Sequence, residues 1–176
     1  AGLAFHPETG ELWASQNERD NLGDDLPAEE LNILVPGGPI EHYGWPYCYE
    51  DGLPNPEYPD AQRCLGKVGP ALEMQAHSAP LGMVFYDHEQ FPVEYRGDLF
   101  MAFHGSWNRS ERTGYKVVRV EVEDGQPISY DDFATGWLTE SGTVAGRPVA
   151  VEVGPEGSLY VSDDGTGRIW RIRWVG

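Results

Sequence analysis

The chain has 176 residues, with 29 acidic and 12 basic side chains and a formal net charge of −17 at pH 7. This charge argues against binding to nucleic acid or to an anionic membrane surface, because both depend on basic residues, although acidity also serves solubility alone. No run of about 20 apolar residues is present, so no membrane span is expected. The length suits one domain or part of one, and the start at Ala1, with no Met and no signal peptide, leads us to expect a processed product, an excerpt or a truncated gene product.

Short strands dominate the predicted secondary structure. Gly and Pro recur every few residues, and apolar residues seldom follow helical spacing. The only expected helix is a short one at 27–30, which begins with Pro. The expected strands are, in chain order, 2–5, 11–15, 31–34, 81–86, 98–103, 115–122, 131–137, 149–153, 158–162 and 168–173. We therefore predict an all-β chain.

A long excursion at about 36–79 interrupts the strands. It is too long for an ordinary hairpin loop, which indicates a functional or capping insertion. Cys48 and Cys64 are its two cysteines, and a disulfide between them would stabilise the loop by roughly 3 kcal/mol on the chain-entropy estimate. Such a bond would point to an oxidising compartment, such as the periplasm or the exterior. The alternative is two unrelated thiols.

An internal repeat predicts the architecture. Residues 2–15 and 149–162 both read as a strand, a Pro-Glu turn, a strand and then a polar loop, and 82–102 repeats this scheme with a longer turn. Repeats of this kind are typical of β-propeller blades; a β-sandwich is the competing architecture. Because propellers typically have about four to eight blades, three units would form about half of a six-bladed ring, with their polar loops at one end of a central channel.

Three polar loops are candidates for one shared site. The first, 16–25, contains four carboxylates, and the others are 104–109 and 146–148. Hard cations such as Ca²⁺ prefer oxygen ligands, and loops carried by a rigid scaffold often hold binding residues. The first loop is therefore a candidate site for a cation or a polar ligand.

Several motifs resemble those of the glucose/sorbosone dehydrogenase family. They are Asn-Glu-Arg-Asp-x-Leu-Gly-Asp-Asp at 17–25, Tyr-Gly-Trp-Pro at 43–46, Ala-His-Ser-Ala-Pro-Leu-Gly at 76–82, Tyr-Arg-Gly-Asp-Leu-Phe at 95–100, His-Gly-Ser-Trp-Asn-Arg at 104–109 and Gly-Arg-Pro at 146–148. The family consists of six-bladed propeller enzymes that use pyrroloquinoline quinone (PQQ), and the greatest likeness is to its L-sorbosone dehydrogenase-like members. The resemblance implies that residues 1–176 are the carboxyl-terminal part of a single β-propeller domain.

This resemblance implies a PQQ- and Ca²⁺-dependent oxidation of an aldose or sorbosone-type sugar, with hydride passing to the quinone. The expected partners are the sugar and an electron acceptor such as a cytochrome c or a quinone, in the periplasm or outside the cell. The family's catalytic His lies on an earlier blade and is not in this chain, so this half alone is expected to be inactive. The alternative is a non-redox, calcium-stabilised propeller that acts as a sugar-binding module or a lactonase-type hydrolase.

The resemblance also implies ligands for the cofactor. Gln16, Asn17 and Glu18 match a loop whose oxygens, largely backbone carbonyls, bind the Ca²⁺ that also contacts the quinone. Arg147 matches an arginine that binds a PQQ carboxylate, for which a guanidinium is well suited. A further cofactor-binding cation comes from the segment that contains Trp107, Asn108 and Arg109. Arg109 is the natural candidate, although the glucose enzymes carry Lys there, and Trp107 could stack on the cofactor or on a sugar face.

A second calcium site is implied farther along the first loop. In the family it uses acidic groups and the tyrosine of the Tyr-Gly-Trp-Pro motif, which maps it to Asp24, Asp25 and Tyr43. Glu29 and Glu30 are rivals, because the loop is longer in this chain. The plainer interpretation is that Asp24 and Asp25 only cap or solvate a turn.

Plainer roles exist for the other residues as well. Arg109 can be a surface cation, and Arg147 can pair with a structural carboxylate. We interpret His77 as a structural histidine and the Asp-Asp-Gly sequence at 163–165 as a turn, because Asp and Gly suit turn geometry.

Overall fold

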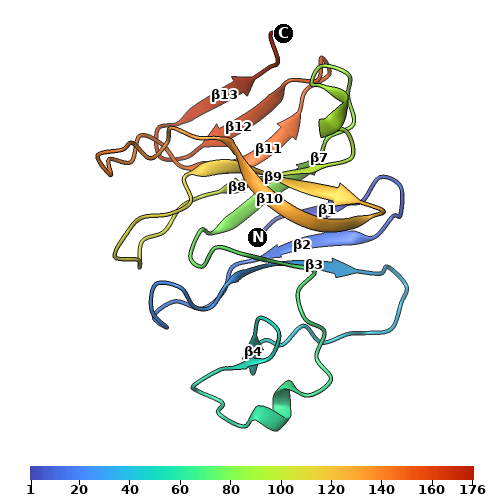
Figure 1. Ribbon diagram of the computed structural model, residues 1–176, viewed down its shortest axis with the longest axis vertical. Coiled ribbons are helices and arrows are strands. Elements are labelled where there is room, and N and C mark those ends of the chain that lie inside the picture. The colour runs from blue at the N-terminus through green and yellow to red at the C-terminus, as the bar shows by residue number, and fades with distance from the viewer.

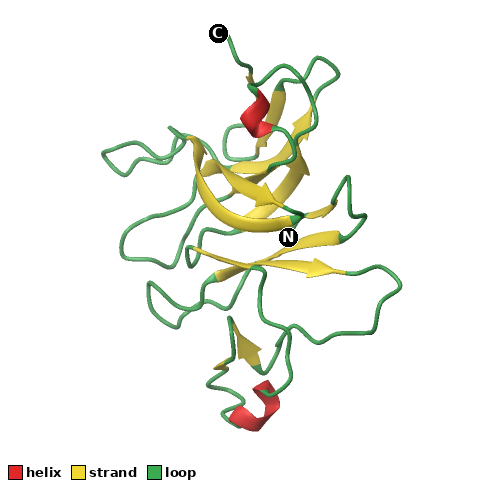
Figure 2. Ribbon diagram, turned by 45° about the vertical axis from the view of Figure 1, so that its right-hand side comes forward, coloured by secondary structure: helices red, strands yellow, loops and turns green.

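The computed structural model describes residues 1–176 and shows an all-β chain (Figure 1). Helical structure is confined to two short 3₁₀ turns, η1 (Ala61–Cys64) and η2 (Val93–Tyr95) (Figure 2). The strands are β1 (Leu3–Phe5), β2 (Leu12–Gln16), β3 (Glu29–Leu34), β4 (Cys48–Tyr49), β5 (Leu53–Pro54), β6 (Leu72–Met74), β7 (Pro80–Phe85), β8 (Leu99–Phe103), β9 (Lys116–Glu123), β10 (Gln126–Ala134), β11 (Pro148–Val153), β12 (Leu159–Asp163) and β13 (Arg168–Ile172). The predicted all-β class is confirmed. No helix is long and apolar enough to cross a membrane.

Three antiparallel sheets follow one another along the chain. Their strand orders are β1-β2-β3-β6, β7-β8-β9-β10 and β11-β12-β13, and β4 and β5 form a separate small pair. Each predicted repeat unit supplies the first two strands of one of the three large sheets. The repeat in the sequence therefore corresponds to a repeated sheet in the structure.

The middle sheet has both faces covered, and β8 shows why. All five of its residues, Leu-Phe-Met-Ala-Phe, are buried. Because side chains alternate across a strand, Leu99, Met101 and Phe103 pack into a cluster shared with the first sheet, whereas Phe100 and Ala102 pack into a cluster shared with the third sheet. A strand buried on both faces has no polar positions, which explains its continuous apolar run.

The first strands of the three sheets lie close together, and glycine permits this approach. A Cβ atom on Gly2 would overlap the carbonyl oxygen of Leu81, and one on Gly82 would lie 2.6 Å from the Cα atom of Ala150. β1 therefore packs on β7, and β7 on β11. This contact fixes the spacing of the sheets and of the loops that leave them.

The expected helix at 27–30 is wrong. Glu29 and Glu30 instead begin β3, where they pair with Met74 and Glu73 of β6. Both glutamates are almost fully buried, and their carboxylates accept hydrogen bonds from backbone N–H groups of other loops. These tertiary contacts override a local helix propensity, which is only a weak preference.

The other strand predictions differ from the structure mainly at their ends. The strand expected at 131–137 is displaced, because β10 covers 126–134. Three short strands, β4, β5 and β6, lie within the excursion at 36–79 and were not predicted. They have two or three residues each, so alternation of apolar residues cannot reveal them.

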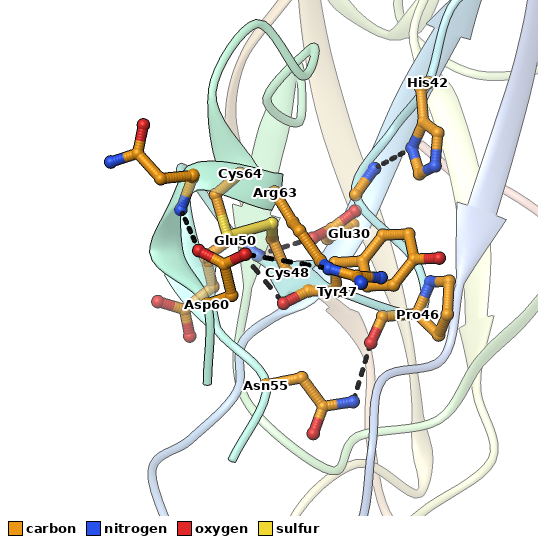
Figure 3. Close-up of a disulfide and its surroundings, with 12 residues drawn as sticks. Glu30, His42, Pro46, Tyr47, Cys48, Glu50, Asn55, Asp60, Arg63 and Cys64 are labelled. Atoms are coloured by element: carbon orange, nitrogen blue, oxygen red, sulfur yellow. Dashed lines mark hydrogen bonds and ion pairs between the residues drawn. A yellow bond between two sulfur atoms is a disulfide. The ribbon is translucent and has the colours of Figure 1, made fainter. Parts of the chain in front are cut away.

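The predicted disulfide is confirmed: Cys48 and Cys64 are bonded, with their Cα atoms 5.7 Å apart (Figure 3). The bond closes the outer part of the excursion, which projects from the first sheet (Figure 1). Glu50 lies two residues after Cys48. Its N–H donates to the Glu30 carboxylate at 2.7 Å, and its own carboxylate accepts from the Ala28 N–H at 2.6 Å. The excursion is thus anchored directly to the start of β3.

Candidate functional site

Polar loops follow the second strand of each sheet, as the repeat predicts. Residues 17–28 follow β2, residues 104–115 follow β8, and residues 164–167 follow β12. The first two loops lie on the same side of the molecule (left in Figure 1). Hydrogen bonds join the first loop to the second, and the second to the third. The structure therefore brings the first two predicted loops, together with residues 164–167, into one continuous polar region. The third predicted loop, 146–148, lies instead at the start of β11 and joins this region through Arg147, whose guanidinium donates to the carbonyl oxygens of His104 and Gly105.

Two buried glutamates fix the start of the first loop. Glu29 is 3% exposed and Glu30 is 1% exposed. The Glu29 carboxylate accepts hydrogen bonds from the N–H groups of Glu18 at 2.7 Å and Ala79 at 2.9 Å, and Glu30 accepts one from Glu50 at 2.7 Å. Three segments distant in sequence are consequently fastened to the beginning of β3.

The carboxylates of Glu18, Glu29 and Glu30 lack compensating positive charge. Burial, together with the nearby charges of Glu30 and Glu29, raises the pKa of Glu18 to about 7, against a hydrogen bond from Gln16 that lowers it. Burial also raises the pKa of Glu29 to about 7 and raises that of Glu30. Glu18 Oε2 is buried and has no hydrogen-bond partner. A cation bound here would stabilise the ionised carboxylates.

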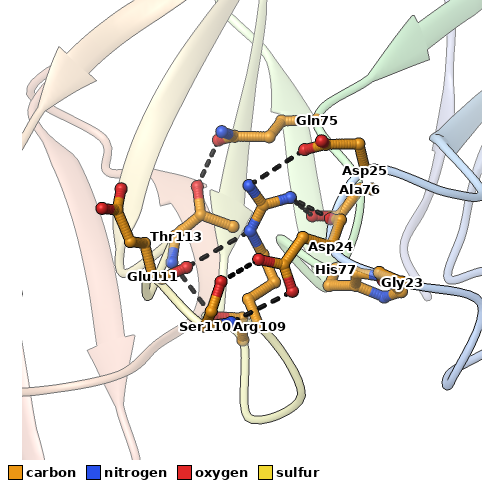
Figure 4. A network of polar contacts seen from close by, with 11 residues as sticks. Gly23, Asp24, Asp25, Gln75, Ala76, His77, Arg109, Ser110, Glu111 and Thr113 are labelled. Carbon is orange, nitrogen blue, oxygen red and sulfur yellow. Dashed lines mark hydrogen bonds and ion pairs between the residues drawn. The ribbon is translucent and has the colours of Figure 1, made fainter.

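The second loop is fastened to the far end of the first (Figure 4). The Arg109 guanidinium donates to the carbonyl oxygen of Asp24 and pairs with the Asp25 carboxylate at 3.2 Å. The Ser110 N–H and hydroxyl both donate to the Asp24 carboxylate. Hydrogen bonds from Ser110 lower the pKa of Asp24. The positive charge of Arg109 is therefore already neutralised within the chain.

His77 also contacts both of these loops. It is 5% exposed and has a φ of 64°, a conformation that is uncommon for residues other than glycine. Its Nε2 atom lies 2.9 Å from the carbonyl oxygen of Gly23, and its Nδ1 atom lies 3.3 Å from Asn108 Nδ2. Asn108 also donates to Asp20 at 2.7 Å. These contacts agree with the predicted structural role of His77.

Arg147 differs from Arg109 because it forms no ion pair. Its guanidinium donates only to backbone carbonyl oxygens, those of His104 at 3.4 Å and Gly105 at 3.1 Å, and it lies 5.7 Å from the centre of the Tyr115 ring. Its side chain is half-buried. A half-buried guanidinium without a carboxylate partner is suited to bind an anionic group.

Asp163 holds the backbone of Arg147 in place. It is 3% exposed, and its carboxylate accepts hydrogen bonds from the Arg147 N–H at 2.8 Å, the Thr166 hydroxyl at 2.6 Å and the Trp170 indole at 3.0 Å. Burial opposes ionisation, but these hydrogen bonds outweigh it and lower the pKa of Asp163 to about 2. The Oδ1 atom of its neighbour Asp164 lies 2.9 Å from His104 Nε2 and so ties the loop 164–167 to the second loop.

The residues expected to form the second calcium site lie apart. Tyr43 donates to the carbonyl oxygen of Ile33 at 2.8 Å and to Glu41 at 2.9 Å, and no contact joins it to Asp24 or Asp25. Burial and the Glu41 carboxylate raise the pKa of Tyr43 to about 12. Tyr43 instead lines a cavity of about 390 Å³. Two other predicted residues, Gln16 and Asn17, line the same cavity.

Asp163 has more than the predicted turn role, and the sequence contains a signal for it. The repeat that aligns 12–15 with 159–162 also aligns Gln16, at the end of β2, with Asp163, at the end of β12. Both residues therefore end the second strand of a sheet, where a polar loop begins. The role of Glu29 and Glu30 in fastening three loops had no such signal, because it depends on which distant backbone groups reach them.

Comparisons with known proteins agree with this description. A family model described as TrAA12-like matches residues 1–175. A protein of Borreliella burgdorferi, described as uncharacterized, is 36% identical over 97% of this chain and 45% of its own length. A pyrroloquinoline quinone-dependent pyranose dehydrogenase of Coprinopsis cinerea is 28% identical over 89% of this chain and 26% of its own length.

Among solved structures, a calcium structure of the Trichoderma reesei carbohydrate-active enzymes family AA12 is similar, with a TM-score of 0.75 and 26% identity. The match covers 96% of this chain and 50% of that chain. The chain thus spans half or less of the length of each of these three proteins.

Proposed function

We propose, because the chain belongs to the TrAA12-like family, that it is part of a PQQ- and Ca²⁺-dependent dehydrogenase that oxidises an aldose or sorbosone-type sugar. The family relationship supports an oxidoreductase, as does the 28% identity to a PQQ-dependent pyranose dehydrogenase. The cofactors and the substrate of this chain are our inference from its site.

One observation carries the proposal: one end of the polar region has a positive side chain without an anionic partner, and the other end has a buried carboxylate oxygen without a hydrogen-bond donor. At one end Arg147 has no carboxylate partner, and at the other end Glu18 Oε2 is buried without a hydrogen bond. PQQ has three carboxylates and requires a cation such as Arg147 in an otherwise acidic protein. A Ca²⁺ ion would satisfy the opposite need at Glu18.

The residues present fit a calcium ion that is held largely by backbone oxygens. No group of three or more His, Cys, Asp or Glu side chains is arranged to bind a metal ion, so side chains alone do not form the site. Ca²⁺ takes about six to eight oxygen ligands, including backbone carbonyls. We propose that Gln16, Asn17 and Glu18 supply protein oxygens, with Glu18 Oε2 as the free side-chain ligand.

We propose a different grouping for the second calcium ion than the one suggested by the motifs. The Asp24 carboxylate is engaged by Ser110, and Tyr43 lies elsewhere. Of the two rivals, Glu30 is supported by its position, because Glu50 and the excursion that contains Tyr43 are attached to it. Asp24 and Asp25 then serve to hold Arg109.

The remaining predicted residues support the cofactor in different ways. Arg147 would bind a PQQ carboxylate directly, positioned by Asp163. Asn108 and Arg109 would act indirectly, because their side chains tie the second loop to the first. Trp107 makes no hydrogen bond with these residues and is 72% exposed, so it remains available for a ligand.

When bound, PQQ would supply the hydride-accepting chemistry and Ca²⁺ would supply Lewis-acid chemistry. We propose that the residues of this chain bind and orient the cofactor and the sugar, and that they do not supply the base that removes the sugar hydroxyl proton. We propose that this base is a histidine in the remaining half of the protein. The electron acceptor, a cytochrome c or another quinone, also lies outside this chain.

We propose that the chain is the carboxyl-terminal half of a six-bladed propeller. Leu3 and Phe5 of β1 are 66% and 65% exposed and project from the face of the first sheet that no other sheet covers. Exposed apolar side chains on a sheet face favour a covering partner. The disulfide supports an oxidising compartment, either the periplasm or the exterior.

The test adds PQQ and Ca²⁺ to the full-length protein and follows the quinone absorbance while aldoses are added. Bleaching of the bound quinone, and reduction of an artificial electron acceptor, are the expected results. A protein that is stabilised by Ca²⁺ but does not bind PQQ would contradict the redox function. It would favour the alternative, a calcium-stabilised sugar-binding module or lactonase-type hydrolase.

A further inference from the structure

A second groove lies beside the polar region, between the loop 104–115 and the turn 138–144. Its volume is about 690 Å³, which is within the usual range for sites that bind small molecules. Its lining includes Trp107, Arg112 and Glu140. Both of its walls lie on the same side of the molecule as the first loop (left in Figure 1).

Trp107 supplies the one large aromatic surface in this groove. It is 72% exposed, and apart from Leu138 and Gly142 the other residues of the lining have charged or hydroxyl-bearing side chains. An indole combines a broad apolar face with low conformational entropy, so it can bind the flat face of a ring at little cost of ordering. Hydroxyl and charged groups around it can bond the ring substituents.

The walls of the groove are already held in place. The Arg112 guanidinium donates to the carbonyl oxygen of Gly142 at 2.8 Å, which joins one wall to the other. The opposite wall is closed by a hydrogen bond from the Thr139 N–H to the Thr143 carbonyl at 3.0 Å, and the hydroxyls of Thr139 and Ser141 are 2.9 Å apart. Such preorganisation lowers the entropic cost of binding.

The charges of the groove favour a neutral ligand. The lining contains two arginines, Arg109 and Arg112, and two glutamates, Glu111 and Glu140, and Arg109 also pairs with Asp25, so the groove has no excess positive charge. A tricarboxylate such as PQQ would gain little here, in contrast to Arg147, which has no carboxylate partner. Hydroxyl groups, however, can both accept from arginine and donate to glutamate.

Arg109 connects this groove to the proposed site. It lines the groove and also pairs with Asp25 in the first loop at 3.2 Å. A ligand in the groove is therefore separated from the far end of the first loop by only one side chain. A chain of linked rings could extend from one to the other.

We infer that the groove is a saccharide subsite, in which Trp107 stacks on a pyranose ring beyond the ring that is oxidised. The physiological substrate is then a pyranose oligosaccharide rather than a free monosaccharide. This inference rests on the proposed function for the oxidised ring, but binding in the groove requires neither PQQ nor turnover.

The first test is hydroxyl-radical footprinting of Trp107 in the full-length protein, read by mass spectrometry. Cellotetraose and maltotetraose are the probes, which distinguish the two glucan linkages, and D-glucose and mannitol are controls. We expect one tetrasaccharide to lower the oxidation rate of Trp107 by about threefold or more, since stacking covers the indole. An unchanged rate with both tetrasaccharides would overturn the inference. So would slow oxidation without any saccharide, which would mean that the rest of the protein covers Trp107.

The second test compares kcat/KM for the protected tetrasaccharide with kcat/KM for D-glucose. Trp107→Ala should lower this ratio about tenfold, whereas Trp107→Phe, which keeps an aromatic face, should lower it by less than about threefold. Trp174→Ala is the matched control, because Trp174 is 50% exposed but lies next to Gln90, away from the groove; it should leave the ratio unchanged. An unchanged ratio in Trp107→Ala would overturn the subsite. Footprinting protection in a protein that fails to bind PQQ would instead refute only the proposed function.

Discussion

Buried carboxylates at the two ends of the polar region differ in how fully they are compensated. Asp163 accepts four hydrogen bonds, two of them from Thr166, and has a pKa of about 2. Glu18 has a pKa of about 7, because burial and two neighbouring glutamates oppose its ionisation. The satisfied carboxylate positions a free arginine, and the unsatisfied one leaves room for a cation. The difference shows how one acidic chain can prepare both an anion site and a cation site.

The largest effect is expected from removing the free arginine. Arg147→Ala should weaken PQQ binding about a hundredfold in the full-length protein, because a charge-assisted contact with a cofactor carboxylate would be lost. Quinone absorbance titrations in the presence of Ca²⁺ measure this change.

Arg109→Ala is the matched control for that substitution. Arg109 is already paired with Asp25, so its loss should weaken PQQ binding by less than about fivefold. If both substitutions weaken binding equally, the distinction between a free and a neutralised arginine is wrong.

A smaller effect is expected at the carboxylate that positions Arg147. Asp163→Asn should lower the free energy of unfolding by about 2 kcal/mol, because a buried charged acceptor of four hydrogen bonds is replaced by an amide that also carries donors. Urea denaturation measures this loss. The neighbouring Asp164→Asn affects an exposed carboxylate and should change stability by less than about 0.5 kcal/mol; equal losses would show that Asp163 has no special role.

The smallest expected effect is on the pH dependence of folding stability, which differs between the glutamates at one end of the polar region and Asp163 at the other. The pKa values of Glu18 and Glu29 are raised from 4.5 to about 7 on folding, so their contribution to stability is complete below about pH 4.5 and is lost as the pH rises through about 7. The pKa of Asp163 is lowered from 3.8 to about 2, so its contribution is present above about pH 3.8 and is lost as the pH falls through about 2. Between pH 4.5 and 7 the glutamates alone should determine the slope.

In EDTA, the melting temperature should therefore fall by roughly 3 °C or more as the pH rises from about 4.5 to 7. Added Ca²⁺ should reduce this fall, because it binds the ionised carboxylates. Glu18→Gln should flatten the slope in EDTA. A melting temperature that rises over this interval would contradict the assignment of an uncompensated cluster.

Much of the fold could be predicted from local patterns. The repeat located the first two strands of each sheet, and the strand expected at 98–103 corresponds to β8. The helix expected at 27–30 failed because its glutamates are fixed by backbone groups far away in the sequence. The short strands in the excursion were not predicted, because two or three residues are too few to show a periodic pattern.

For the site, the motifs identified the loops but not which of their residues are free to bind a ligand and which are already paired within the chain. Arg109 and Arg147 both read as candidate cofactor cations, and only the structure shows that Asp25 neutralises the first. The sequence suggested only a turn role for Asp163. Its four hydrogen bonds come from three different residues, and local residue types do not reveal that combination. Partner identity depends on tertiary contacts, which residue type and spacing do not encode.

The central claim is that the two ends act together on one ligand. The most direct measurement is the dissociation constant of PQQ for the full-length protein, at saturating Ca²⁺ and in EDTA. Because coupling between two ligands is reciprocal, the account predicts tighter PQQ binding with Ca²⁺, a dependence that Glu18→Gln removes and Arg147→Ala retains at lower affinity. Equal PQQ affinity with and without Ca²⁺ would contradict the account.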